Sequence, residues 1–520
     1  MTASRITRFI AAFALAGSGA HAATFNVTRG DDPAPDGCLA GDCSLREAIE
    51  ATPATPGVDT IVLGAGQYQI TRGELSIASE MIIEGAGSGD TRIVASGDVD
   101  LFHVMPFGAL TLQGAEIGSP DDSAMVIEDN ANALLRDVVV PANAGLVGTV
   151  VPPGDSGTGS IRIEHSTIAS TLGCLQPQGS CRVFDSHLHE VLVLDSEIEF
   201  RRIDLDGANT DQWGLTIGGA APVTIEDSTI RRTSTPLRLA ANGTTTGARV
   251  TIKRTRFLDN TGPLYGDRGA IVDMDEVEFR HHRVSDDLIG APAVLLAQQG
   301  PAWFISRALV ANNRGGNALD GAVVRVLGGG RVVFDNSTFD DNTFRTGLAG
   351  FGHTIGLYNN TGLPAILWLF HTTMQRSIYL EDDTQGSLVT VRGTPADVRI
   401  DNSLLRGTCA FGGGGAITQG VGNVETIGDT CGLDPADNEV DVSALAIGLG
   451  DLADNGGFTQ TMLPQRNSVL LDAADTDFCT FFGALDQRGY ARSPDGTDCD
   501  VGAVEAYAVA DSIFANGFDG

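Results

Sequence analysis

Alternating apolar and polar residues recur between residues 160 and 410 in one short unit. The unit is apolar, polar, apolar, then a polar pair that often contains Asp, Asn or Ser, then another apolar position. Two examples are Ile161-Arg-Ile163-Glu-His-Ser166-Thr-Ile168 and Val223-Thr-Ile225-Glu-Asp-Ser228-Thr-Ile230. A period of two predicts strands that bury one face. The last apolar position recurs in steps of 22 to 35 residues, at Ile168, Ile198, Ile230, Phe257, Phe279, Leu309, Phe339, Met374 and Leu404.

A strand pattern that returns about every 30 residues, with no helical pattern between the returns, predicts a solenoid of stacked coils. A β-sandwich would show turn signals every 8–12 residues, and a β-propeller would need four strands in about 40–45 residues. We therefore predict an all-β chain, a right-handed parallel β-helix over residues 58–430. Asn260, Asn312 and Asn342 follow three of the units. Since asparagine tolerates the left-handed conformation, we expect them at tight bends, stacked in one ladder.

Both ends of the solenoid carry capping signals, which matter because an uncovered rung would pair with other chains. Ser44-Leu-Arg-Glu47 has the spacing of a capping box. Leu45, Ala48 and Ile49 then form an apolar stripe at helical spacing, which predicts a short helix over the first rung. At the other end, a loop closed by Cys479 and Cys499 is expected to cover the last rungs.

The composition is acidic and rich in glycine. There are 66 Asp and Glu against 33 Lys and Arg, so the formal net charge is −33. Such a surface argues against nucleic acid and anionic lipid as partners, because both require clustered basic residues. The 66 glycines suit coil corners where positive φ is needed, and the excess acid suits turns and outward strand positions.

The N-terminus predicts export. Arg5 and Arg8 precede an apolar run, and small residues follow up to Ala22, so residues 1–22 are interpreted as a signal peptide. No later apolar stretch is long enough to span a bilayer. We expect a secreted or cell-surface protein, monomeric, without a transmembrane helix.

Eight cysteines agree with an oxidising compartment. No Cys-x-x-Cys pair occurs, which argues against zinc. Sequence does not determine the connectivity, since eight cysteines allow 105 pairings. The candidates fall into close neighbours: Cys38 and Cys43, Cys174 and Cys181, Cys409 and Cys431, and Cys479 and Cys499.

Two segments resemble known families. Asp42-Cys-Ser-Leu-Arg-Glu-Ala-Ile49 with Gly57-Val-Asp-Thr-Ile61 resembles the CSLREA region of secreted bacterial β-helix proteins. Residues 448–461 and 486–505 together are similar to the choice-of-anchor Q region, although Phe458 replaces a usual proline. The resemblance implies the pectin-lyase-like superfamily, a cap over residues 23–57 and an anchor-type region over residues 431–507. The tail, residues 508–520, is a candidate sorting signal.

Hydrolase and lyase chemistry were both considered. Asn209-Thr-Asp211 and Gly352-His353 are similar to fragments of pectin-type glycosidases. That chemistry needs two carboxylates on neighbouring coils, whereas these fragments lie 142 residues apart, so turn roles are favoured. A lyase would need a basic residue beside carboxylates, often with calcium. Two groups supply such residues: Arg201 and Arg202 with Asp204 and Asp206, and Arg231 and Arg232 with Glu226 and Asp227. Mixed charges of this kind usually form a solvated strand face.

Metal binding has only weak signals. His187 and His189 are expected on one strand face, without a third ligand. Asp498 and Asp500 are candidates for weak calcium binding, although turn roles are favoured.

We therefore predict an exported β-helix that binds glycans or cell-surface proteins, with no catalytic, cofactor-binding or metal-binding residue assigned. The alternative is an extracellular polysaccharide lyase or glycoside hydrolase acting on acidic glycans. Arginines and carboxylates converging on successive coils of one sheet would favour that alternative.

Overall fold

The fold is taken from a computed structural model. It describes residues 22–54, 57–120, 122–150, 157–208, 213–240, 247–266, 269–284, 291–316, 321–344, 352–359, 362–379, 386–426, 428–479, 484–493 and 498–506. The predicted signal peptide, apart from Ala22, and the candidate sorting signal lie outside these residues, as does Asn209-Thr-Asp211.

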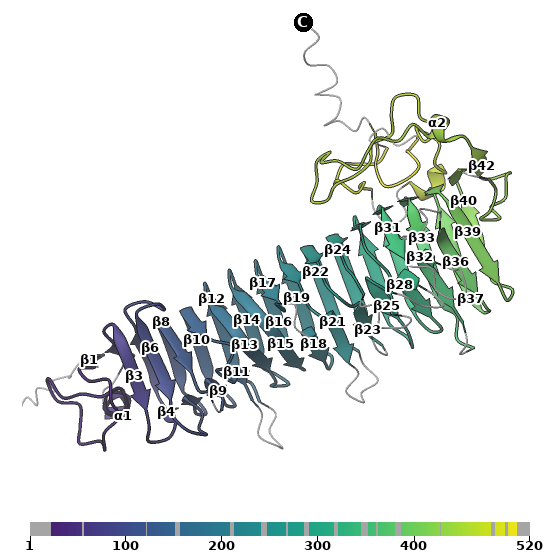
Figure 1. The fold of residues 1–520 in the computed structure, drawn as a ribbon. Helices are drawn as coiled ribbons and strands as arrows, with labels where there is room; N and C mark the ends of the chain where they lie inside the picture. Colours follow the sequence, from purple (N-terminus) through teal and green to yellow (C-terminus); the bar gives the residue numbers. More distant parts are fainter. Residues whose placement is uncertain are drawn as a thin grey trace, which may run out of the picture.

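The chain forms a long coil of parallel strands, with its N- and C-terminal coils at opposite ends (Figure 1). Each turn of the coil contributes strands to three sheets, and every pairing between named strands is parallel. The predicted fold class, an all-β right-handed parallel β-helix with a short N-terminal helix and a disulfide-closed C-terminal region, is confirmed.

The strands are grouped here by sheet. The first sheet contains β1 (Thr24–Asn26), β2 (Asp59–Val62), β5 (Glu80–Glu84), β8 (Ala109–Gly118), β10 (Asn132–Val140), β12 (Ser160–Glu164), β14 (Ser180–Phe184), β16 (Glu197–Arg201), β19 (Pro222–Glu226), β22 (Arg249–Leu258), β24 (Ile271–Arg280), β26 (Ala302–Ser306), β29 (Arg331–Asp335), β33 (Ala365–Phe370), β37 (Ala396–Asp401) and β40 (Gln419–Val421). The second sheet adds the ends of β8, β10, β22 and β24 to β3 (Gly66–Ile70), β6 (Thr91–Ala95), β13 (Thr167–Cys174), β15 (His187–Leu194), β17 (Asp204–Asp206), β20 (Thr229–Arg231), β27 (Leu309–Ala311), β30 (Thr338–Asp340), β34 (Thr373–Gln375), β38 (Leu404–Arg406), β41 (Val424–Thr426) and β42 (Glu439–Val442). The third sheet adds the ends of β13 and β15 to β4 (Leu75–Ile77), β7 (Phe102–Val104), β9 (Met125–Ile127), β11 (Leu146–Thr149), β18 (Trp213–Gly218), β21 (Thr235–Ala240), β23 (Leu264–Gly266), β25 (Leu295–Ala297), β28 (Gly321–Leu327), β32 (Gly352–Tyr358), β36 (Ser387–Arg392) and β39 (Thr408–Gly412). A separate short pair is formed by β31 (Asn342–Phe344) and β35 (Ser377–Tyr379).

Like side chains stack inside the coil because neighbouring strands are in register. On the second sheet the inward ladder contains ten register partners, and each is almost completely buried. They are Ile168, Leu188, Leu205, Ile230, Phe257, Phe279, Val310, Phe339, Met374 and Leu405. Most positions of the predicted repeat therefore correspond to one stack of buried side chains inside the coil.

Three positions of the predicted repeat are wrong. Ile198 lies on the first sheet in β16. Leu309 and Leu404 are each one residue out of register, because Val310 and Leu405 are the inward partners. Leu309 and Leu404 are nevertheless buried. Since both faces of β27 and β38 are buried, the alternation that normally marks the inward face is lost there.

The polar pair of the repeat forms the corner between the first and second sheets. The first residue after each strand often has a left-handed backbone, with φ of 49° at His165 and 51° at Asp185. The next residue is often a serine that points inward, and its hydroxyl accepts a hydrogen bond from the preceding coil. Ser166 Oγ, for example, accepts from the amide of Val138 at 3.0 Å. The serines of the repeat thus satisfy backbone amides that the corner leaves without strand partners.

An asparagine ladder lies at the next corner, as predicted, but with one position changed. Asn260, Asn313 and Asn342 are buried and donate to carbonyl oxygens of the preceding coil. Asn312 lies outside the ladder, because it is the corner residue with a left-handed backbone, with φ of 57°. The side chain of His282 takes the ladder position between Asn260 and Asn313.

Asn313→Ala is expected to lower the free energy of unfolding by about 2–4 kcal/mol, because the amide of His282 and the carbonyl of Phe279 both lose a buried partner. Urea denaturation measured by circular dichroism tests this expectation. Asn467→Ala, at an exposed turn residue, is the control. Equal midpoints for the two variants would contradict the role of the ladder.

The N-terminal helix α1 (Leu45–Ala51) is followed by the 3-10 turn η1 (Thr52–Ala54) and lies at the first coils (Figure 1). Its predicted capping box is confirmed. Glu47 Oε2 accepts from the amide of Ser44 at 2.7 Å, and Ser44 Oγ accepts from the amide of Glu47 at 3.3 Å. Leu45, Ala48 and Ile49 are buried as predicted. One strand lies before the predicted start of the solenoid at residue 58, because β1 pairs with β2.

Candidate functional site

Six charged or titratable side chains meet on the outer face of the second sheet, on three successive coils. We call them the His–Arg cluster. Neighbouring strands are in register from β15 through β17 to β20, so outward positions lie above one another. The cluster contains His187, His189, Asp204, Asp206, Arg231 and Arg232.

Hydrogen bonds run across the coils within the cluster. His187 Nδ1 is 3.2 Å from Asp204 Oδ2. Arg231 donates from Nε and Nη2 to the two oxygens of Asp204, at 2.9 and 2.6 Å. Arg232 binds both oxygens of Asp206 in the same bidentate manner. Bidentate guanidinium–carboxylate pairs fix orientation as well as charge.

Both aspartates of the cluster remain anionic. Burial raises the pKa of Asp204, but hydrogen bonds from His187 and Arg231 outweigh it and lower the pKa to about 2. Burial also opposes the hydrogen bonds at Asp206, whose pKa is lowered by Arg232 and by the amide of Ala208. A glycoside hydrolase needs one carboxylic acid that stays protonated. These two aspartates therefore do not supply the acid of a hydrolase.

The imidazole of His187 has the arrangement of an oriented base. Asp204 holds its Nδ1, while Nε2 has no hydrogen-bond partner within the part of the chain that the structure describes. The side chain of His187 is 39% exposed. A half-exposed imidazole with one nitrogen fixed by a carboxylate can take or deliver a proton at the other nitrogen.

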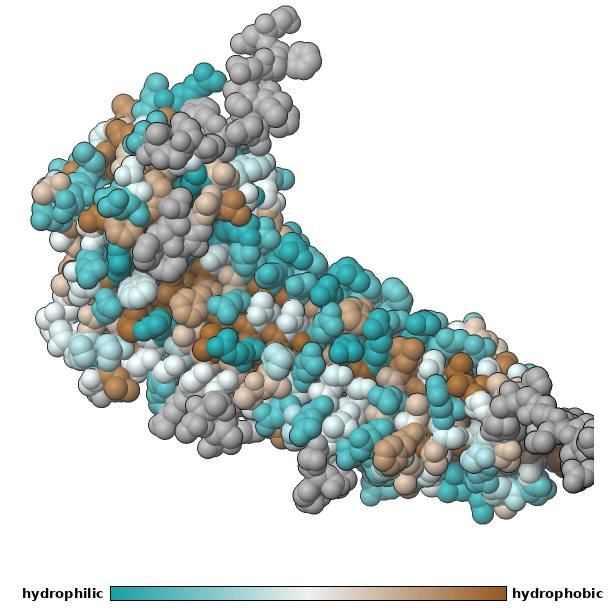
Figure 2. Space-filling view, turned by 180° about the vertical axis from the view of Figure 1, so that it is seen from behind, coloured by the Kyte–Doolittle hydropathy of each residue, from teal (hydrophilic) through white to brown (hydrophobic). Residues whose placement is uncertain are grey.

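An open depression of about 600 Å³ adjoins the cluster at the corner of the first and second sheets. The corner residues His165, Asp185, Arg202 and Asp227 line it, as do His187 and Asp204. Hydrophilic side chains gather along the upper edge of the solenoid in Figure 2, next to the C-terminal region. A smaller depression of about 290 Å³ on the first sheet is lined by arginines and a glutamate but by no histidine.

In the structure, the arginines of the two predicted groups bind other carboxylates than those predicted from the sequence. Arg231 and Arg232 bind Asp204 and Asp206, not the adjacent Glu226 and Asp227. Arg202 binds Asp185 on the preceding coil, and the partners of Arg201 are Glu199 and Glu226. Arg202, Arg231 and Arg232 thus pair with carboxylates one coil away and not with those nearest in sequence. His165 and Asp185 were missed because each looks like an ordinary turn residue.

The other sequence candidates have structural roles. His353 is completely buried in β32 and does not lie at a turn as expected. Its Nε2 is 3.0 Å from the hydroxyl of Tyr358, and burial lowers its pKa to about 3. Asp500 accepts hydrogen bonds from the amides of Asp472 and Ala506, so both of its oxygens are used. Within the described ranges, no group of three or more His, Cys, Asp or Glu has the geometry to hold a metal ion.

The C-terminal region, residues 443–506, lies against the side of the last coils as well as their end (Figure 1). It contains α2 (Ala444–Ile447) and the 3-10 turn η2 (Thr476–Phe478). Leu404 and Val424 on the outer face of the second sheet form an apolar cluster with its residues Ile447, Leu470 and Val501. This packing explains why Leu404 is buried although it does not point into the coil.

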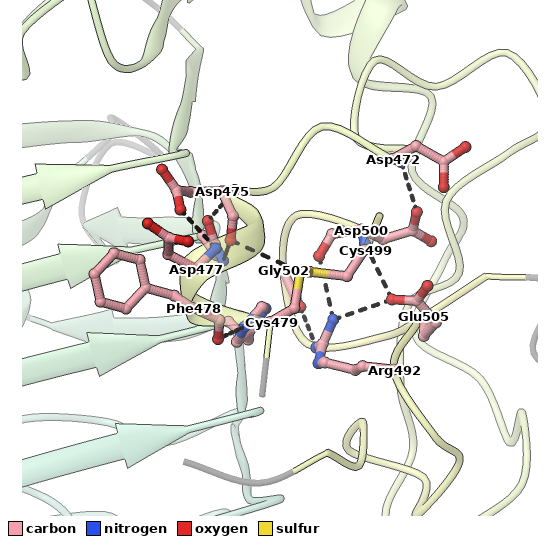
Figure 3. The surroundings of a disulfide bond; sticks show 12 residues. Asp472, Asp475, Asp477, Phe478, Cys479, Arg492, Cys499, Asp500, Gly502 and Glu505 are labelled. Atoms are coloured by element: carbon pink, nitrogen blue, oxygen red, sulfur yellow. Dashed lines mark hydrogen bonds and ion pairs between the residues drawn. A yellow bond between two sulfur atoms is a disulfide. The ribbon is translucent and has the colours of Figure 1, made fainter. Parts of the chain in front are cut away.

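Arg492 is the central polar contact of this region (Figure 3). Its side chain is fully buried and donates to Asn336 Oδ1 at 2.7 Å and to the carbonyls of Asp500 and Gly502 at 3.1 and 2.5 Å. The carboxylate of Glu505 lies 3.5 Å away. Arg492 therefore joins the corner residue Asn336 of the solenoid to the loop that the Cys479–Cys499 disulfide closes.

Asp335, which precedes Asn336, makes the stability of the fold depend on pH. It is buried, and burial raises its pKa from 3.8 to about 6, against the opposing effects of Asn336 and Arg492. A carboxyl group whose pKa is raised on folding stabilises the fold most below its unfolded pKa. That stability is lost as the pH rises from about 4 to about 6.

Asp335→Asn is therefore expected to stabilise the protein by about 1–3 kcal/mol at pH 8 and to have little effect at pH 4. Thermal unfolding of both proteins at the two pH values measures the difference. Asp341→Asn, at a half-exposed corner residue, serves as the control. A variant no more stable than the wild type at pH 8 would show that Asp335 is not under strain.

Four disulfides join neighbouring cysteines, namely Cys38–Cys43, Cys174–Cys181, Cys409–Cys431 and Cys479–Cys499. No helix within the described ranges is long and apolar enough to cross a membrane.

No family model matches the chain, so the CSLREA-like and choice-of-anchor Q-like regions stay predictions. No curated protein matches it either.

Similar solved structures include the A-module of mannuronan C-5 epimerase AlgE4 from Azotobacter vinelandii, at 14% identity over 77% of this chain and 96% of that chain, with a TM-score of 0.29. Pectate lyase Pel9A is 12% identical over 94% and 97%, with a TM-score of 0.26. A mannuronic acid-specific polysaccharide family 6 lyase from human gut microbiota is 12% identical over 71% and 86%, with a TM-score of 0.30. These are parallel β-helix proteins, and at such identities the likeness concerns the fold alone.

Proposed function

We propose that the protein is an exported glycan-binding β-helix, which holds a polysaccharide along the corner between its first and second sheets. One observation carries the proposal: the His–Arg cluster and the adjoining depression present polar side chains on successive coils. Coils follow one another at the strand spacing of about 4.8 Å, close to the length of one pyranose unit. A repeating polymer can thus meet a similar group at each coil.

The distribution of charge supports this location. Residues 160–283 hold 14 of the 33 Lys and Arg but only 17 of the 66 Asp and Glu. This part of the solenoid is close to neutral, whereas the rest carries nearly all of the net charge of −33. An acidic glycan is repelled least here, and Arg231 and Arg232 provide donors suited to its carboxylates.

A second candidate function is a polysaccharide lyase, which the arrangement of His187 favours. In that reaction a base removes the proton from the carbon next to a uronate carboxylate, and a cation balances the developing charge. The bond from the neighbouring carbon to the glycosidic oxygen then breaks, which forms a carbon–carbon double bond, and the leaving oxygen takes up a proton. His187 Nε2 would be the base and Arg231 the balancing cation. A hydrolase is disfavoured because Asp204 and Asp206 stay ionised.

Affinity electrophoresis of the purified protein in gels containing alginate, polygalacturonate or neutral glucans, with and without calcium, tests the proposal. The protein is expected to be retarded by at least one polysaccharide. Ultraviolet absorbance from unsaturated chain ends would support the lyase. Retardation by none of the polysaccharides, or release of reducing ends without unsaturation, would contradict the proposal.

A further inference from the structure

The outer face of the second sheet changes abruptly one coil beyond the His–Arg cluster. Thr229 and Arg231 of β20 have Arg256 and Leu258 of β22 as register partners. There the C-terminal region reaches the sheet, and the guanidinium carbon of Arg256 lies 4.4 Å from the ring centre of Phe458. On the following coil Arg280 donates to Gln460 Oε1 at 2.7 Å.

The segment that carries Phe458 is held firmly in this place. Gly457 has φ of 85°, and a Cβ atom there would lie 2.7 Å from the Cα of Arg488, so the turn needs glycine. Thr459 is buried, and its hydroxyl accepts from Gln487 Nε2 at 2.9 Å.

Gln487 links this segment to the second sheet. Its Nε2 also donates to the carbonyl of Ala308 at 3.0 Å, and its Oε1 accepts from the hydroxyl of Thr338 at 2.6 Å. Since Thr338 lies on β30, four coils beyond β20, the region stays in contact with the sheet well past Phe458.

The corner meets the same C-terminal region two coils further along than the sheet does. Its row of corner residues continues from Asp227 through Arg254 to Glu276 and Arg307. Arg307 lies against the C-terminal region, because a Cβ atom on Gly489 would come within 3.2 Å of its Nη1. The C-terminal region thus meets the outer face of the second sheet at Arg256 and the corner at Arg307.

We propose that Phe458 and Gln460 form an end wall of the glycan site, so that the site binds the end of a polysaccharide chain and not its middle. This inference rests on the proposed function. A chain that enters from the coils of β13 and β15 stops at Phe458, whose half-buried ring offers an apolar surface to the face of the terminal sugar. Gln460 provides amide groups beside it.

Alginate and polygalacturonate, each intact and partially hydrolysed, are the probes for this inference. At equal mass, hydrolysed samples hold more chain ends, so the wild-type protein is expected to bind them more strongly, in proportion to those ends. Phe458→Ala is expected to weaken binding roughly two- to tenfold. Phe411→Ala, at an exposed phenylalanine of the third sheet, is the control. Phe458→Tyr, which keeps the ring, should restore binding.

The outcomes separate the two proposals. If the wild-type protein binds none of the polysaccharides, the proposed function itself fails. If it binds them in proportion to mass, or if Phe458→Ala behaves like Phe411→Ala in a protein that unfolds at the wild-type temperature, the end wall alone is wrong.

Discussion

Arg492→Met is expected to lower the free energy of unfolding by about 3–5 kcal/mol, because it removes one partner of a buried charged network and leaves the others unpaired. Glu505 and Asn336 lose their guanidinium partner, and two carbonyls lose their donor (Figure 3). The C-terminal region should then separate from the solenoid before the coils unfold. Differential scanning calorimetry and limited proteolysis measure both effects.

Arg376→Met is the matched control for this change. Arg376 is an exposed arginine whose Nε lies 2.7 Å from Asp341, and pairs of this kind contribute about 0–1 kcal/mol. If the two variants were equally stable and equally resistant to proteases, Arg492 would not hold the region in place.

Replacing Arg231 and Arg232 together by alanine is expected to weaken glycan binding by roughly tenfold or more, since an anchoring arginine contributes about 2 kcal/mol. The change removes the donors and also leaves Asp204 and Asp206 without their cations. An acidic chain would then meet two unbalanced carboxylates. Titration of the same polysaccharide against both proteins gives the affinity ratio.

The control is Arg136→Ala, which removes a half-exposed arginine that pairs with Glu164 across one coil of the first sheet. Its affinity should match that of the wild type. An equal loss in both variants would point to general charge effects, and no loss in either would place the glycan elsewhere.

Much of the solenoid was predictable because each coil repeats the same local chemistry. The serine in the corner, the inward apolar residue and the capping box at Ser44 all depend on neighbours in sequence or on the same position one coil away. Prediction failed at Leu309 and Leu404, where a second layer buries both faces. No local sequence pattern indicates this covering layer, because the residues that form it lie far away in the sequence.

The candidate site was predictable only in part. That His187 and His189 share a face follows from the period of two. Their aspartate and arginine partners did not follow, because coil length is not constant: it is 17 residues between the register partners Val183 and Phe200 and 35 between Phe334 and Leu369. Without the coil lengths, the residue above a given side chain cannot be identified. The contact between Arg492 and Asn336 has no periodic signal at all.

Hydroxyl-radical footprinting of the protein with and without a polysaccharide that retards it tests the glycan site most directly. Oxidation of His187 and His189 should fall when the polysaccharide is bound. Oxidation of Trp213, which is 45% exposed on the third sheet, should stay unchanged. Protection of Trp213 with no change at either histidine would contradict a glycan site on the second sheet.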